Sequence, residues 1–168
     1  MDTKKILQDW LSGIRFSHMV TVEPQPPLPY RQDEIVQRFR TIEFSLNKKY
    51  LLCSFPKWKW SDKFWWVGFK EGDGVCHYLH YHLLLYSPTK IYKDDRKNII
   101  DDIQLGWLRQ PSLISSDGRT RTIEPLHIEK IRNSISASMY CSKWIEQGKP
   151  DDSYFFVTPK QKPIAVAE

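Results

Sequence analysis

The chain has 168 residues, of which 40% are hydrophobic and 14% aromatic, a composition typical of a globular protein and not of a disordered one. Its length suffices for one domain with a hydrophobic core of its own. The formal net charge of +5 suits a polyanionic partner, although many basic proteins of this size bind no nucleic acid.

The cysteine content and the apolar runs bear on the compartment. Three cysteines are widely spaced and form no CxxC pair, which favours free thiols in a reducing compartment. No apolar run approaches the roughly 20 residues that span a bilayer. We therefore expect a soluble intracellular protein without a signal peptide and without a membrane partner.

The N-terminal third of the chain predicts two helices around one strand. Residues 4–14 read as a short amphipathic helix, and residues 16–23 alternate between apolar and polar as a strand does. A proline-rich connector follows at 25–29. In residues 31–50 the apolar side chains recur at spacings of three and four, beginning with Ile35, which predicts a long helix with one apolar face.

The middle of the chain predicts a β-hairpin. Residues 64–69 and 76–86 are rich in strand-forming residues. Between them Gly72-Asp73-Gly74 is a turn signal, so we expect the second strand to return beside the first. The sequence Ser87-Pro88 ends the second strand.

The C-terminal half predicts two further helices and two further strands. Residues 95–110 and 132–147 have helical periodicity, and 122–129 and 153–158 read as strands. Pro125 weakens the first of these strands, which we therefore expect at a sheet edge or at a bulge.

The order of these elements predicts the fold class. Strands alternate with helices and include one hairpin, so we expect an α+β fold with a five-stranded, mainly antiparallel sheet and flanking helices. One domain is expected over residues 1–158, followed by a flexible tail over 159–168.

His80 and His82 are the first candidate functional residues. They are two apart in a predicted strand, so both side chains point to the same face. Neutral imidazoles are good ligands for divalent metal ions. The alternative is a pair of histidines on a solvated strand face. A structural zinc site that adds Cys76 and His77 fits no standard zinc-binding spacing.

Tyr140 and Lys143 are the second candidate pair. They are three apart in a predicted helix and so share one of its faces. A free tyrosine has a pKa of about 10 and is a poor nucleophile unless a nearby cation stabilises the phenolate. The alternative is a tyrosine packed between helix and sheet, with the lysine in solvent.

The two pairs together, in this order, resemble the HUH endonuclease superfamily, and within it the rolling-circle replication initiators (Rep proteins) of plasmids and circular single-stranded DNA viruses. The segments that match its motifs are 18–22, His80-Tyr81-His82 with the apolar run Leu83-Leu84-Leu85, and Tyr140 with Lys143. In conjugative relaxases of this superfamily the tyrosine precedes the histidines, whereas here it follows them. Small HUH transposases share the present order. A single tyrosine in the motif indicates a single-tyrosine enzyme.

The resemblance implies a metal site with a third, acidic ligand before the histidine pair. Glu71 is the best match, and Mn²⁺ or Mg²⁺ is the implied cofactor. A tight turn at Asp73-Gly74 would pair Glu71 with Cys76, about 13 Å along the strand from His80. A wider loop or a bulge would bring Glu71 to the histidines. Asp73 and His77 are the substitutes for Glu71.

The resemblance further implies that Tyr140 is the nucleophile, that the product is a 5′-phosphotyrosine, and that Lys143 orients the phosphate, the metal-bound water or the phenolate. Interleaved cations and indoles are typical of single-stranded DNA binders, although tryptophans also close the edges of cores. The candidate DNA contacts are Lys57, Trp58, Lys59, Trp60, Arg119 and Arg121.

The expected function is therefore metal-dependent nicking and rejoining of single-stranded or hairpin origin DNA to initiate rolling-circle replication. The chain has no GxxxxGK[ST] helicase motif, so a host helicase is an expected partner, or else the chain is one domain of a larger Rep. The cytoplasm of a prokaryotic host is the expected location, or the nucleus for a eukaryotic virus. The alternatives are a small HUH transposase acting on hairpin DNA ends, a non-catalytic DNA-binding module of the same fold, and a structural protein.

Overall fold

The structure is a computed structural model and describes residues 3–23, 31–51, 59–72, 80–89, 91, 96–110, 125–143, 145 and 154–157. The elements in chain order are α1 (Thr3–Ser12), β1 (Phe16–Val22), α2 (Gln32–Leu51), the 3₁₀ helix η2 (Trp60–Asp62), β2 (Trp65–Glu71), β3 (His80–Tyr86), α3 (Arg96–Leu108), β4 (His127–Lys130), α4 (Ser134–Ser142) and β5 (Tyr154–Val157). The expected α+β fold with a five-stranded antiparallel sheet is confirmed. No helix in the described part of the chain is long and apolar enough to cross a membrane.

The five strands form a single sheet in the order β4-β1-β3-β2-β5, and every neighbouring pair is antiparallel. The expected pairing of β2 with β3 is confirmed, and β3 lies at the centre of the sheet. The strand that follows Pro125 lies at one edge, as expected. The centre of the sheet thus brings β1 and β2 to either side of the strand that carries the two histidines.

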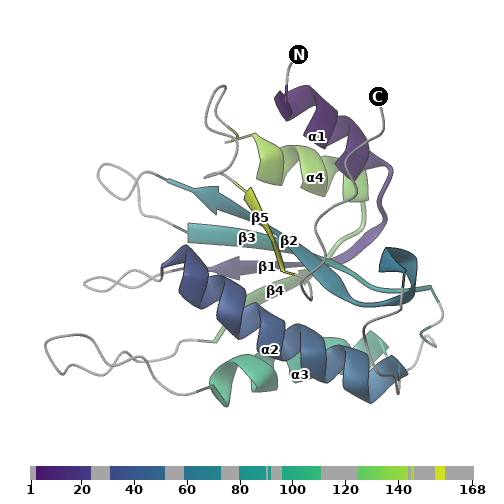
Figure 1. The fold of residues 1–168 in the computed structure, drawn as a ribbon, viewed down its shortest axis with the longest axis vertical. Coiled ribbons are helices and arrows are strands. Elements are labelled where there is room, and N and C mark those ends of the chain that lie inside the picture. The colour runs from purple at the N-terminus through teal and green to yellow at the C-terminus, as the bar shows by residue number, and fades with distance from the viewer. Residues whose placement is uncertain are drawn as a thin grey trace, which may run out of the picture.

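Helices cover both faces of the sheet (Figure 1). The helices α1 and α4 pack together on one face, and α2 and α3 pack together on the other. Because side chains alternate along a strand, β3 contributes to both layers. Its Tyr81, Leu83 and Leu85 belong to the hydrophobic core on the α2–α3 side, whereas Leu84 belongs to the core on the α1–α4 side.

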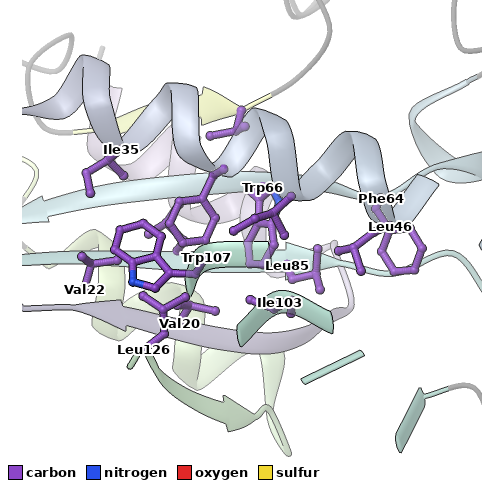
Figure 2. Close-up of a cluster of buried hydrophobic side chains, with 14 of the residues drawn as sticks. Val20, Val22, Ile35, Leu46, Phe64, Trp66, Leu85, Ile103, Trp107 and Leu126 are labelled. Carbon is purple, nitrogen blue, oxygen red and sulfur yellow. The ribbon is translucent and has the colours of Figure 1, made fainter. Parts of the chain in front are cut away.

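The core on the α2–α3 side is aromatic and closely packed (Figure 2). The ring centroid of Phe39 on α2 lies 4.9 Å from that of Trp66 and 5.7 Å from that of Trp107. Gly106 allows α3 to approach α2, because a Cβ atom there would lie 3.2 Å from Cγ1 of Ile42. Burial of each such large side chain stabilises the fold by roughly 1.5–3 kcal/mol, so this layer supplies much of the stability.

Most element boundaries differ from the sequence prediction by one or two residues, and two differences have a visible local reason. The helix α4 begins at Ser134 and not at 132, because the side chain of Asn133 caps it by accepting a hydrogen bond from the Ser136 amide. The strand β4 begins at His127, after Leu126, whose amide donates to the Gln104 side chain and not to a neighbouring strand. Residues 122–124, 146–153 and the predicted tail 159–168 lie outside the described residues.

Glu43 is a buried carboxyl group on α2 with a perturbed pKa. Glu43 is 3% exposed, and the side-chain amide of Asn47 donates a hydrogen bond to Glu43 Oε1 at 3.2 Å. Burial raises the pKa of Glu43 from 4.5 to about 8, against the opposing charges of Lys63 and Arg40. The native state therefore binds more protons than the unfolded chain between these two pH values.

This pKa predicts a stability that falls as the pH rises. The contribution of Glu43 to the free energy of unfolding is expected to be fully present below pH 4.5 and to decline by about 3–5 kcal/mol as the pH rises through about 8. The variant Glu43→Gln keeps an acceptor oxygen for Asn47 and should flatten this decline in denaturant unfolding measured across the same range. The exposed Glu23→Gln is the matched control and should leave the decline unchanged. A decline of equal size in both variants would assign it to other groups.

Candidate metal centre and tyrosine

The candidate site begins with the register between β2 and β3. Glu71 lies directly opposite His80, and Phe69 lies opposite His82. Cross-strand partners project to the same face of a sheet, and residues two apart in one strand do as well. Glu71, His80 and His82 therefore share one face. Glu71 does not pair with Cys76, so of the two hairpin geometries considered for the sequence, the one with the wider connection holds.

The three side chains converge on a small volume. His82 Nε2 lies 2.7 Å from Glu71 Oε2, and His80 Nε2 lies 3.2 Å from the same oxygen. One potential ligand atom from each residue lies within 4.8 Å of the other two. The His82 and Glu71 side chains are only 6% and 11% exposed, whereas His80 is 29% exposed. The cluster is thus closed on the side of the sheet and reached by solvent near His80.

The helix α4 brings the candidate nucleophile to this cluster. The ring centroid of Tyr140 lies 5.4 Å from that of His82. Lys143 Nζ lies 3.9 Å from the centroid of the Tyr140 ring and 3.3 Å from Glu71 Oε1. Tyr140 itself is 45% exposed, so part of its side chain is accessible from solvent. All five residues that the sequence proposed for the metal and the chemistry therefore lie together.

The electrostatics of the cluster favour the forms that bind a metal ion. Burial alone would raise the pKa of Glu71, but hydrogen bonds from His82 and Lys143 and the charges of the histidines outweigh it and lower that pKa. Burial lowers the pKa of His82, against the raising effect of Glu71. Desolvation alone would lower the pKa of Lys143, but the hydrogen bond to Glu71 outweighs this effect and raises that pKa. An ionised carboxylate and a neutral imidazole are the ligand forms required.

The helix α1 fixes the end of α4 that carries Lys143. Lys4 Nζ donates to the backbone carbonyl of Lys143 at 2.8 Å, and Gln8 Nε2 donates to Ser142 Oγ at 3.0 Å. A cation at a helix C-terminus also compensates the negative end of the helix dipole. Beneath α4, the Cys141 thiol contacts Met19 Sδ at 3.7 Å. These contacts position the helix over the sheet.

One residue of the site was not proposed from its chemistry in the sequence. Thr21 on β1 lies opposite His82 on β3, and its Oγ1 is 3.1 Å from His82 Nδ1. The alternation of residues 16–23 predicts on which strand face a residue lies, but not which residue of another strand lies opposite it. The sequence therefore shows Thr21 only as one of several polar residues in an alternating strand, which does not single it out.

Of the predicted DNA contacts, the structure describes Lys59 and Trp60. Trp60 is half-buried, with its ring centroid 4.9 Å from that of Trp65, which favours the alternative that it closes a core edge. Lys59 is exposed beside it. The other candidates lie outside the described residues: Lys57, Trp58, Asp73, Cys76, His77, Arg119 and Arg121.

Two imidazoles and one carboxylate form a ligand set suited to first-row divalent ions, and three protein ligands leave coordination positions open. Glu71, His80 and His82 can therefore hold a metal ion. No protein-family model, curated protein or solved structure matches this chain. A functional assignment consequently depends on the residues and their geometry.

Proposed function

We propose that this chain is a metal-dependent endonuclease and strand transferase that nicks and rejoins single-stranded DNA through a covalent 5′-phosphotyrosine on Tyr140. This is the activity of rolling-circle replication initiators of the HUH superfamily. The observation that carries the proposal is the convergence of Tyr140 and Lys143 on the cluster of Glu71, His80 and His82. Tyr140 and Lys143 lie far from the histidine pair in the sequence and follow it, in the motif order of that superfamily.

The proposed cofactor is Mn²⁺ or Mg²⁺, and when bound such an ion would polarise the scissile phosphate and offset the charge that develops on it. Tyr140 Oη attacks phosphorus, the P–O3′ bond breaks, and the tyrosine's proton passes by way of solvent to the departing 3′-oxygen. The products are a 5′-phosphotyrosine and a free 3′-OH that can prime synthesis. Because the new ester conserves the bond energy, the reverse step rejoins the strand.

Lys143 lies where it can act on both the nucleophile and the ligand set. Its ammonium is 3.9 Å from the Tyr140 ring centroid and 3.3 Å from Glu71 Oε1. A cation so close to a tyrosine stabilises the phenolate as the proton leaves. The same cation can attract a phosphate to the site. Lys143 therefore serves to orient the reacting groups.

The substrate that fits this site is single-stranded or hairpin DNA, whose backbone can reach an exposed tyrosine. The chain contains no helicase motif, so strand separation would come from a host helicase or from a further domain. The transposase alternative predicts a dimer in solution. The alternative of a non-catalytic DNA-binding module predicts DNA binding that EDTA leaves unchanged and no covalent product.

The test uses the polarity of the covalent product. A pool of random-sequence single-stranded oligonucleotides, labelled at either end, is incubated with the protein and Mn²⁺ and then denatured. We expect the 3′ label to migrate with the protein and the 5′ label to be released on a shortened strand, and we expect EDTA to prevent both. If no 3′ label becomes resistant to denaturation, or if it does so equally in EDTA, the proposal is wrong.

A further inference from the structure

We infer that Thr21 is a positioning residue that holds His82 in place as a metal ligand. Its hydroxyl can form a hydrogen bond with Nδ1 in either tautomer of the imidazole. The inference rests on the metal site of the proposed function and extends it to a residue of β1. Thr21 contacts none of the reacting groups directly and would act through His82 alone.

The geometry places the His82 ring between two partners. Its Nδ1 lies 3.1 Å from Thr21 Oγ1, and its Nε2 lies 2.7 Å from Glu71 Oε2. The strand registers place both partners, since Thr21 on β1 lies opposite His82 and Glu71 on β2 lies opposite His80. His82 is only 5% exposed, so water has little access to replace either contact. The ring is therefore held at both nitrogens by neighbouring strands.

The partner of Nδ1 must be able to act both as a hydrogen-bond donor and as a hydrogen-bond acceptor. With its proton on Nε2, a neutral imidazole donates to Glu71, and Nδ1 must accept a hydrogen bond. If Nε2 instead offers its lone pair to a cation, the proton resides on Nδ1, and Nδ1 must donate. The net charge of the ring is the same in both cases.

A hydroxyl can donate to Nδ1 in the first case and accept from it in the second by rotating about its C–O bond. A carboxylate could only accept and an ammonium could only donate. Thr21 therefore satisfies Nδ1 both before and after Nε2 takes a metal ion, without any movement of the ring. Partners of this kind orient ligating histidines, and their loss typically weakens metal binding by about 10- to 100-fold.

The test compares Thr21→Val, which removes the hydroxyl at nearly constant shape, with Thr21→Ser, which retains it. Mn²⁺ affinity is measured by calorimetry on the whole chain without DNA. We expect Val to weaken binding by about 10- to 100-fold and Ser to bind within about threefold of the unchanged protein. Valine favours strands, so the fold should persist, and Thr21→Ala provides a second variant without the hydroxyl.

A spectroscopic readout separates this role from a structural one. Nitrogen-15 NMR of His82 should report the Nε2–H tautomer without metal and the Nδ1–H tautomer with Zn²⁺, in the unchanged protein and in Thr21→Ser. Equal Mn²⁺ affinity in Thr21→Val and Thr21→Ser overturns the inference and leaves the proposed function standing. Weaker binding in Thr21→Val, from a protein that binds Mn²⁺ but nicks no DNA, supports the inference while the proposed function fails.

Discussion

Replacing Tyr140 with phenylalanine is expected to abolish the covalent protein–DNA adduct while Mn²⁺ binding and the fold are retained. The substitution removes one oxygen atom, the proposed nucleophile, and leaves the ring that lies beside His82 and under Lys143. No ester can then form at this position, so nicking should fall by more than about a thousandfold. The measurement is the denaturing gel with 3′-labelled DNA, together with calorimetric titration of Mn²⁺.

The matched control for Tyr140→Phe is Tyr154→Phe, which alters another partly exposed tyrosine on β5. This variant should form the adduct as the unchanged protein does. An adduct that persists in Tyr140→Phe would show that the nucleophile lies elsewhere. Loss of Mn²⁺ binding in Tyr140→Phe would show instead that the phenol is part of the ligand set, contrary to the role proposed for it.

Replacing Glu71 with glutamine is expected to weaken Mn²⁺ binding by at least about a hundredfold and to abolish adduct formation with it. The amide keeps the shape of the side chain but removes the negative charge from the ligand set. It also removes the ion pair with Lys143, whose ammonium lies 3.3 Å from Oε1. Calorimetry without DNA measures the first effect, and the labelled-DNA assay measures the second.

The exposed carboxylate of Glu129 provides the control for Glu71→Gln. Glu129 on β4 lies 3.0 Å from His127 Nε2, so it too pairs with a histidine, yet it belongs to no cluster of three ligands in the described part of the chain. Glu129→Gln should bind Mn²⁺ as the unchanged protein does. Equal affinity in both glutamine variants would falsify the assignment of Glu71 as a ligand.

Periodicity predicted much of the fold because each signal it uses is local. Apolar residues at helical spacing from Ile35 onward mark the buried face of α2, and alternation places His80 and His82 on one face of β3. The position of Glu71 could not be derived in this way. It depends on the register of β2 against β3, which the connection between them sets, and a Gly-Asp-Gly signal does not determine the length of that connection.

Thr21 and Trp60 show the same limit for contacts between side chains. The bond from Thr21 to His82 exists because β1 lies beside β3 in one register, which no pattern within residues 16–23 encodes. Trp60 looked like a stacking residue in the sequence, but its ring packs against Trp65, which follows shortly after it in the chain. Composition predicted its chemistry but not the side of the molecule that it faces.

The alternation along β3 has a consequence for redesign of this protein. Tyr81, Leu83 and Leu85 are committed to the core beneath α2 and α3, whereas His80 and His82 face the opposite layer. A library that varies the α4 surface around Tyr140 is therefore expected to leave the packing of the other layer undisturbed. Because the sheet separates the two layers, substitutions on the α1–α4 side need not reduce the stability that the α2–α3 core supplies.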